Sequence, residues 1–307
     1  MAVKTKIPQM LIGATIVSIG TTLPEVFVSF TAAVGGQTAM SVGNAIGSMF
    51  CNTALILAIS MTFSPTVVKR KEFVPKIIIL AISIICLFIF SMYRQINIWQ
   101  SVVLVALFVI YMTYNVVSAI KEMKANKRLE LLPVDVQKEE LSKEHQFDAY
   151  LEKKSWLMIA LFFVGAAAIA VGANLMVSTV SGICGKLNIS EQIVSLTVVA
   201  LGTSLPELVT ALTSLKKNST AISMGNVIGA NILNGTIITG GSGLIAGGII
   251  ILEQDFASLM VTIAGVAVIM LIVCLPILFK QKTYRWQGIS CLAIYGAYLA
   301  YSIASVV

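Results

Sequence analysis

Two glutamates, Glu25 and Glu207, lie within long hydrophobic stretches and occupy the same place in two copies of one motif. Each copy reads Gly-Thr-Thr/Ser-Leu-Pro-Glu, with the glutamate last. A charged side chain at the centre of a membrane span costs about 2.5–3.5 kcal/mol on insertion scales, so such a residue usually marks a functional site. Because the glutamate is duplicated, we expect the two carboxylates to meet at one site.

Each motif also offers oxygen ligands for a cation. Pro24 and Pro206 have no amide hydrogen and clash with the preceding turn, so each helix should kink or break beside its glutamate. A break frees backbone carbonyl groups, whose oxygens suit hard cations such as Na⁺ and Ca²⁺, as do hydroxyl and carboxylate oxygens. The carbonyl groups expected to be freed lie near Ser18, Thr21, Ala200 and Thr203.

A second duplicated string, Gly-Asn-x-Ile-Gly-Ser/Ala, follows each motif and leads to an asparagine, Asn52 or Asn234. Both asparagines interrupt apolar runs at equivalent positions, so we expect them to line the site. Ser48 precedes Asn52 by four residues, which places both on one face of a helix. We expect the glycines of the string to serve only close helix packing.

Charge favours a divalent cation between the two glutamates. Two neighbouring carboxylates repel each other, and one of them would tend to take up a proton. Ca²⁺ would neutralise both, whereas Mg²⁺ is smaller and holds its water ligands tightly. Several Na⁺ ions could offset the same charge, so the two cations would compete. The alternative for each glutamate is a protonated carboxyl group held in a helix interface, which does not explain its duplication beside proline and threonine.

The similarity between the two copies extends beyond the motifs. Glu207 follows Glu25 by 182 positions. At this offset, matching glycine, proline, glutamate and asparagine residues recur without a gap over roughly 40 residues, which we interpret as an internal duplication.

The composition is that of a membrane protein with several spans, because 57% of the residues are hydrophobic, 11% are charged and the mean hydropathy is +0.92. We predict an all-α fold with nine spans. Five spans separate the starts of the two copies, and an odd number makes the copies enter the membrane from opposite sides, as in the inverted repeats of secondary transporters. The predicted spans are 8–34, 41–63, 74–93, 96–120, 155–181, 190–214, 221–250, 256–279 and 286–307.

The chain divides into two halves and a connector. Residues 1–121 form the first half with four spans, 122–154 form a charged linker, and 155–307 form the second half with five spans. The span at 155–181 has no counterpart in the first half. We therefore expect that one helix of about one membrane thickness is missing before residue 1; the alternative is a complete protein of nine spans.

Basic residues predict the orientation. With the linker in the cytoplasm, all but Arg94 and Lys186 of the 21 lysines and arginines fall on the cytoplasmic side, in line with the positive-inside rule. The C-terminus then lies outside. Short loops and no evident targeting segment favour a prokaryotic plasma membrane. The net charge of +7 belongs to these loops and does not indicate a nucleic-acid interface.

The two strings resemble the α-repeats of the calcium/cation antiporter superfamily, and in particular those of prokaryotic sodium/calcium exchangers. The resemblance implies a fold of ten helices in two inverted halves, of which nine would be present here. It also implies four ion positions around the two glutamates, Ca²⁺ and Na⁺ as the transported ions at a ratio of three Na⁺ to one Ca²⁺, and no cofactor. We expect the lipid bilayer as surroundings and no need for an oligomer.

The resemblance also assigns residues to ion positions. It implies that Glu25 and Glu207 bind Ca²⁺ together with backbone oxygens of Thr21 and Thr203, while Asn52 and Asn234 flank the centre. One Na⁺ position would be bordered by Ser18, Thr21, Ser48 and Glu25, and the symmetric one by Ala200, Thr203 and Glu207. Two residues depart from the family pattern: Ala230 stands where a serine is usual, and Asn234 stands where potassium-dependent relatives have aspartate.

These observations predict an electrogenic antiporter that exchanges Ca²⁺ for Na⁺ by alternating access, and not an enzyme. A Ca²⁺/H⁺ antiporter of the same fold is the nearest alternative, because glutamates also carry protons. An intramembrane protease with two acids is a remote alternative, because both acids are glutamates behind prolines and the only histidine, His145, lies in the linker. The five cysteines lack the spacing of a metal site.

Overall fold

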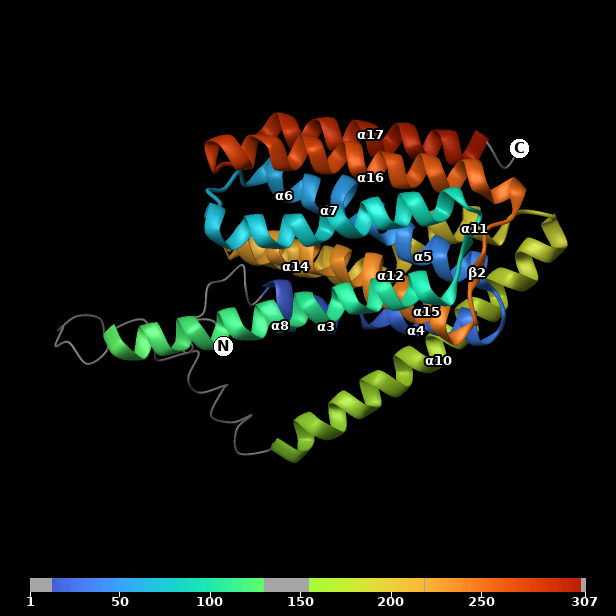
Figure 1. Cartoon of the computed structure of the whole chain (residues 1–307), viewed down its shortest axis with the longest axis horizontal. Coiled ribbons are helices and arrows are strands. Elements are labelled where there is room, and N and C mark those ends of the chain that lie inside the picture. The colour runs from blue at the N-terminus through green and yellow to red at the C-terminus, as the bar shows by residue number, and fades with distance from the viewer. Residues whose placement is uncertain (1–12, 130–154, 218, 305–307) are drawn as a thin grey trace.

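The computed structural model describes residues 13–129, 155–217 and 219–304. The described chain is mostly helical, and most of its long helices lie along the long axis of the molecule (Figure 1). The elements of the first half are η1 (Gly13–Val17), α3 (Ser18–Thr21), α4 (Leu23–Val34), α5 (Thr38–Cys51), η2 (Asn52–Leu57), α6 (Ala58–Phe63), α7 (Arg70–Met92), β1 (Gln95–Ile96) and α8 (Ile98–Leu129).

The second half repeats the helical order after one additional long helix, α10 (Ser155–Leu187). Its remaining elements are α11 (Glu191–Val194), η3 (Ser195–Val199), α12 (Ala200–Thr203), α13 (Leu205–Lys216), α14 (Thr220–Leu233), η4 (Asn234–Ile238), α15 (Thr239–Ile245), β2 (Ile249–Ile250), α16 (Glu253–Lys280) and α17 (Arg285–Ala304). The elements labelled η are short π-helical segments inside longer helices.

Among the described residues, six helices are long and apolar enough to cross a membrane, or up to eight if each of two bent pairs forms one span. Eight of the nine predicted spans coincide with these helices and bent pairs, although 8–34 begins before the described residues. The ninth, 286–307, coincides with α17, which is not one of the eight. The all-helical membrane fold is therefore confirmed, and the number nine stays a prediction.

The prolines of the two motifs bend the chain as predicted. Pro24 and Pro206 lie in the first turn of α4 and α13, where the missing amide hydrogen removes no bond from the helix. The segment 13–21 meets α4 at 51°, and the segment 191–203 meets α13 at 43°. Each motif glutamate thus lies at the start of the helix that follows a bend.

Four π-helical segments occur at equivalent places in the two halves, a feature that the sequence did not predict. The segments η1 and η3 precede the two motifs and start 182 positions apart, and η2 and η4 start at Asn52 and Asn234. A π-helical turn holds one extra residue and is frequent at functional sites. Its position depends on tertiary packing, which spacing along the chain does not reveal.

The second span of each half forms the centre of the molecule. In the most apolar windows of Thr38–Phe63 and Thr220–Ile245, 78% and 83% of residues are buried, against 17% in those of Ile98–Lys121 and Ala167–Leu187. Glycines permit the close approach: a Cβ on Gly47 would lie 2.4 Å from the carbonyl oxygen of Leu196. The packing role predicted for this glycine is confirmed.

The two ends of the helix bundle carry different charges. At one end, β1 pairs with β2 and Arg94 lies 3.1 Å from Glu253. At the other end, Val67 pairs with Lys282, and the Ser64 hydroxyl lies 3.0 Å from that of Thr220. Basic residues beside this second end are Lys69, Arg70, Lys71, Lys216, Lys217, Lys280 and Arg285. The separation predicted from the sequence is therefore present, while the side of the membrane stays a prediction.

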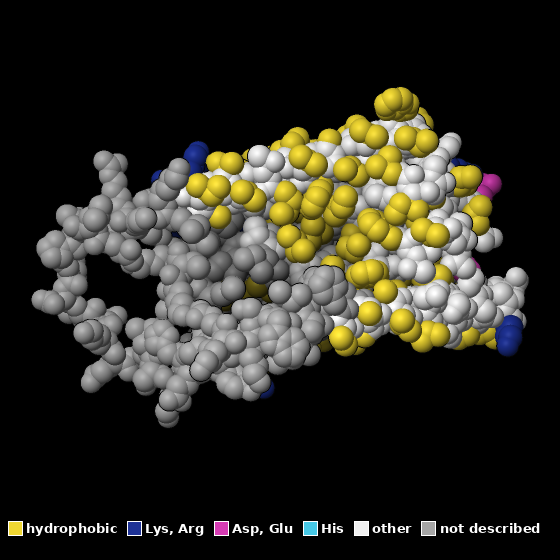
Figure 2. Space-filling view, turned by 90° about the horizontal axis from the view of Figure 1, so that it is seen from below, with side chains coloured by type: hydrophobic (Ala, Val, Ile, Leu, Met, Phe, Trp, Pro, Cys, Tyr) yellow, Lys and Arg dark blue, Asp and Glu magenta, His cyan; other side chains and the backbone are white. Residues whose placement is uncertain are grey.

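The surface between these ends is apolar, as a lipid environment requires. Figure 2 shows one face, on which hydrophobic side chains spread over the described middle, while the charged side chains in view lie toward the ends. Many large apolar side chains of the outer helices are exposed, Val109 and Ile110 of α8 among them. A belt of this kind is expected where lipid replaces water around the helices.

The division into halves and linker is compatible with these elements. Helix α8 continues to Leu129, past the predicted boundary at 121, and α10 begins at Ser155, the first residue of the predicted second half. The linker residues 130–154 and the predicted extra helix before residue 1 lie outside the described residues. The roles assigned to them stay predictions.

The close packing at Gly47 generates a stability prediction. We expect Gly47→Ala to lower the free energy of unfolding by about 1–3 kcal/mol, because the new methyl group would overlap the backbone of η3. Gly296 in α17 is the matched control, since a Cβ there would meet no heavy atom within 4 Å. Gly296→Ala should be neutral or slightly stabilising, because alanine favours the helix. Unfolding of the purified variants in detergent measures both, and equal stabilities would contradict the packing.

Candidate functional site

Glu25 and Glu207 are each the third residue of a helix, α4 and α13, directly after the bend of their motif. Both side chains are completely buried. The amide groups in the first turn of a helix carry partial positive charge, so this position stabilises a carboxylate. The local sequence Leu-Pro-Glu therefore both starts the helix and places the acid at its favourable end.

Crossed hydrogen bonds join the two motifs. The Ser204 hydroxyl donates to Oε1 of Glu25 at 3.0 Å, and the Thr22 hydroxyl donates to Oε1 of Glu207 at 3.2 Å. Thr22 and Ser204 are equivalent positions, since they lie 182 residues apart and each occupies the bend of its motif. Each half thus supplies a hydroxyl to the glutamate of the other half, so both carboxylates lie at the interface between the halves.

A second crossed pair flanks the first. Thr21 Oγ1 lies 3.1 Å from Oδ1 of Asn226, and Thr203 Oγ1 lies 3.1 Å from Oδ1 of Asn44. The symmetry is incomplete at the asparagine amides. Nδ2 of Asn44 donates to the Ser29 hydroxyl at 2.9 Å, but the residue equivalent to Ser29 is Ala211, and Nδ2 of Asn226 has no hydrogen-bond partner in the described part of the chain.

Several buried polar atoms at this interface lack a hydrogen-bond partner among the described residues. They are Oε2 of Glu25, Oε2 of Glu207, and both side-chain amide atoms of Asn52 and of Asn234. A buried polar group without a partner costs about 1–3 kcal/mol, and more when it is charged. Carboxylate and amide oxygens left free in this way are the donor set that a hard cation takes up.

The halves are interleaved, which corrects one predicted grouping. Helix α5 of the first half packs against η3 and α12 of the second, and α14 packs against η1 and α3. The Ser48 hydroxyl consequently lies 3.4 Å from that of Thr203. Ser48 therefore belongs with Ala200 and Thr203, and not with Ser18 and Thr21 as predicted. Spacing along the chain could not show this, because the contact crosses between the halves.

Two of the carbonyl groups predicted to be freed by the bends are occupied by local hydrogen bonds. The carbonyl oxygen of Ser18 accepts from the amide of Thr22 at 2.9 Å and lies 2.5 Å from its hydroxyl, which has one hydrogen to divide between this oxygen and Oε1 of Glu207. The carbonyl oxygen of Ala200 accepts from the amide of Ser204 at 3.1 Å. The helix after each bend begins at Leu23 or Leu205, one residue after the amide donor, so the last i→i−4 hydrogen bond before the bend is kept. Freed carbonyl groups near Ser18, Thr21, Ala200 and Thr203 therefore stay a prediction, in which the Ser18 and Ala200 oxygens already accept a hydrogen bond.

Four polar residues of the interface were not among the predicted site residues, namely Thr22, Ser204, Asn44 and Asn226. The signal was present, because each pair is matched at the offset of 182 and the asparagines lie in apolar runs. The motif contains two adjacent hydroxyl residues, however, and the sequence alone does not indicate which one faces the opposite half.

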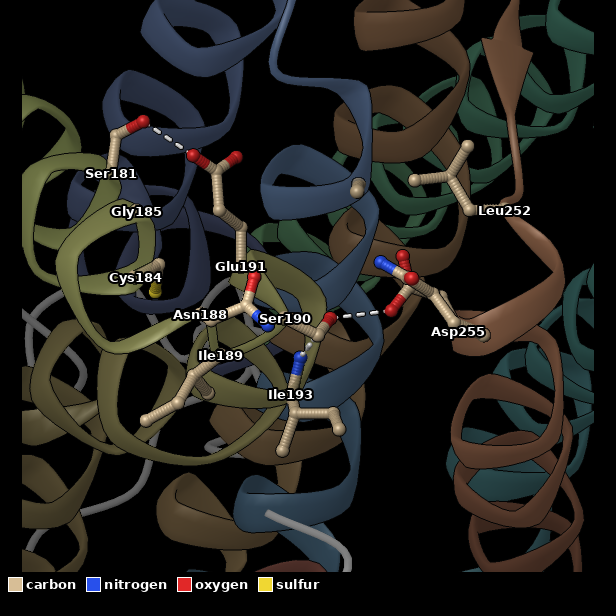
Figure 3. Close-up of a pocket in the computed structure, with 12 residues that line it drawn as sticks. Ser181, Cys184, Gly185, Asn188, Ile189, Ser190, Glu191, Ile193, Leu252 and Asp255 are labelled. Carbon is tan, nitrogen blue, oxygen red and sulfur yellow. Dashed lines mark hydrogen bonds between the residues drawn. The ribbon is translucent and has the colours of Figure 1, made fainter.

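A separate pocket of about 600 Å³ lies among α10, α11 and α16, at the end of the molecule that carries Arg94. Figure 3 shows the Ser181 hydroxyl directed at the carboxylate of Glu191, and the Ser190 hydroxyl directed at that of Asp255. None of the residues predicted for the ion site lines this pocket. The glutamates of the interface and the carboxylates of the pocket are therefore distinct groups.

Comparisons with known proteins agree on one family. The family described as "Sodium/calcium exchanger protein" matches residues 1–117 and 157–304. "Uncharacterized membrane protein MJ0091" of Methanocaldococcus jannaschii is 31% identical over 94% of this chain and 85% of its own length. "Sodium/calcium exchanger MaX1" of Methanosarcina acetivorans is 26% identical over 97% and 90%. A solved structure of the sodium-calcium exchanger NCX_Mj superposes with a TM-score of 0.65 at 28% identity, covering 97% of this chain and 89% of that chain.

The crossed hydrogen bonds generate a prediction about stability. We expect Ser204→Ala to lower the free energy of unfolding by about 1–3 kcal/mol, because it leaves Oε1 of Glu25 buried without this hydroxyl donor. Ser83→Ala is the control, since the Ser83 hydroxyl is equally buried but donates to the carbonyl group of Leu80 in its own helix. Denaturation of both variants in detergent at fixed Na⁺ and Ca²⁺ measures the difference. Equal losses for the two variants would speak against the crossed bond.

Proposed function

The chain belongs to the sodium/calcium exchanger protein family, and from this premise we propose that it exchanges Ca²⁺ for Na⁺ across a membrane by alternating access. The observation that carries the proposal is the pair of completely buried glutamates, each with one carboxylate oxygen that has no described hydrogen-bond partner. Such a pair holds up to two negative charges at one interface. A Ca²⁺ ion, or Na⁺ ions in its place, would compensate them.

The proposed ligands follow from the contacts between the halves. Ca²⁺ would lie between Glu25 and Glu207, with oxygens of Thr21 and Thr203 beside them. One Na⁺ position would be bordered by Ser18, Thr21 and Glu25, and the other by Ser48, Ala200, Thr203 and Glu207. Asn52 and Asn234, which begin the two central π-helical segments, would flank the centre. The ions are cargo, and we propose no resident cofactor and no covalent step.

Exchange follows from the electrostatics of an enclosed site. Two ionised carboxylates without a cation are costly to enclose within a membrane, so an empty site would not close and change sides. Either cargo restores neutrality and permits the transition, because the halves are inverted repeats that meet at the ions. Exchange of more than two Na⁺ for each Ca²⁺ would move net charge, which makes the transport electrogenic.

Proton coupling is the alternative, because the same glutamates could carry protons in place of Na⁺. The hydroxyl groups of Thr21 and Thr203 at the interface favour Na⁺, since a proton needs no additional oxygen ligands. The remote alternative of a protease with two acids does not fit membership of an exchanger family.

The location follows from the helices and the charges. We propose an integral protein of a prokaryotic plasma membrane, surrounded by lipid and not requiring an oligomer, with the basic end and the linker in the cytoplasm and the C-terminus outside. The gathering of basic residues at the end marked by Val67 and Lys282 supports this orientation. The pocket with Glu191 and Asp255 would then face outward, where its carboxylates would attract cations.

The role of the glutamates is tested by amide substitution. Glu207→Gln and Glu25→Gln should each abolish Na⁺-driven uptake of ⁴⁵Ca into proteoliposomes, because the amide keeps the shape but removes the charge that holds Ca²⁺. Glu253→Gln is the control, since Glu253 is exposed and pairs with Arg94 at the end of the bundle. Near-normal uptake by the Glu207 variant would refute the assignment of the site.

The driving ion is tested by imposing gradients one at a time. With pH clamped on both sides, an outward Na⁺ gradient should drive ⁴⁵Ca uptake into proteoliposomes, whereas an outward K⁺ gradient should not. An H⁺ gradient imposed separately, without Na⁺, should not drive uptake either. Uptake that follows only the pH gradient would instead support the Ca²⁺/H⁺ alternative. An accompanying membrane potential, read with a voltage-sensitive dye, is expected for electrogenic exchange.

A further inference from the structure

Two pairs of equivalent positions break the symmetry between the halves, with serine in the first half and alanine in the second. The equivalent of Ser18 is Ala200, and the equivalent of Ser48 is Ala230, each pair lying 182 residues apart. All four residues are completely buried. Both serines therefore belong to the first half, one in the motif segment and one in the helix that follows it.

In the group of residues around Glu207, the serine is Ser48, which the first half supplies from the helix packed against the second motif. Ser48 lies on α5, and its hydroxyl is 3.4 Å from that of Thr203 on α12. Ala200, on the same short helix as Thr203, supplies no hydroxyl. This group of residues thus contains one threonine from the motif segment and one serine from the opposite half.

In the group of residues around Glu25, the serine is Ser18, which lies on α3 in the segment that leads into the first motif. A Cβ on Gly229 would lie 2.6 Å from Oγ of Ser18, so the Ser18 hydroxyl lies against α14 at Gly229, the residue that precedes Ala230. Ala230 occupies the position equivalent to Ser48 but carries no oxygen. The Ser18 hydroxyl donates its hydrogen to the carbonyl oxygen of Thr15 at 3.1 Å, which leaves its oxygen lone pairs available to a cation.

We propose that Ser18 supplies, from the motif segment, the hydroxyl ligand that Ala230 cannot supply from α14. Each Na⁺ position then keeps one serine and one threonine beside its glutamate: Ser18 and Thr21 with Glu25, and Ser48 and Thr203 with Glu207. The inference rests on the proposed function in taking Na⁺ as the ligand. Ser18 would then determine the affinity of the Na⁺ position beside Glu25, where Ala230 replaces the serine that is usual in the family.

The inference is tested by removing the hydroxyl at position 18 and then adding one at position 230. Equilibrium binding of ²²Na to purified protein in detergent measures it without relying on transport. We expect Ser18→Ala to raise the half-saturating Na⁺ concentration roughly tenfold to a hundredfold, because a cation loses one oxygen ligand. Adding Ala230→Ser to this variant should restore most of the affinity, since Ala230 is equivalent to Ser48 and a hydroxyl there would lie near Thr21 as that of Ser48 lies near Thr203.

A matched control separates loss of a ligand from loss of a buried hydroxyl. Ser101 in α8 is equally buried, and its hydroxyl donates to the carbonyl oxygen of Asn97 in a similar local bond. Ser101→Ala should leave ²²Na binding unchanged. Should Ser18→Ala not fold, Ser18→Cys serves instead, because a thiol is of similar size but a poor ligand for Na⁺.

The outcomes distinguish this inference from the proposed function. Wild-type affinity in the Ser18 variant, or no recovery on adding Ala230→Ser, would overturn the inference, even if Na⁺ gradients drive ⁴⁵Ca uptake. Loss and recovery of ²²Na binding would uphold it, even if uptake proved to depend on protons. A wild-type protein that binds no ²²Na would overturn both.

Discussion

The packing of the two halves depends on the burial of two carboxylates at their shared interface. Glu25 and Glu207 are shut off from water, and each is stabilised by the start of its own helix and by a hydroxyl from the opposite half. Neither half can move away without leaving the glutamate of the other without that donor. Oε2 of each glutamate has no hydrogen-bond partner among the described residues and is available to a cation, as proposed above.

The interleaving of the halves follows from small residues next to these acids. Gly47 brings α5 onto the backbone of η3 at Leu196, and Gly229 brings α14 onto Ala14 and Ser18 in the same manner. These contacts are possible because glycine has no side chain to separate the helices. The most buried helices of the described chain are therefore the ones that cross between the halves, and the site belongs to neither half alone.

The residues that could be predicted from the sequence are those whose chemistry is conspicuous in an apolar run. The glutamates and the paired Asn52 and Asn234 were evident because a polar residue in a membrane span is costly. The prolines were evident because they lack the amide hydrogen that a helix requires, and each of these residues occurs twice. Duplication, together with the count of spans between the copies, also predicted two inverted halves. The sequence could not place Ser48 with Thr203 or locate the π-helical segments, because both depend on how the helices pack across the interface.

The first half has serine and the second has alanine at both pairs of equivalent positions, so the two repeats are not interchangeable there. A chimera assembled from two second halves would contain no serine at these four positions, and one assembled from two first halves would contain four. The native number of two serines results only when one first half is combined with one second half. The two copies of the duplicated sequence have therefore diverged at buried positions, so that neither copy could replace the other without changing the number of buried serines.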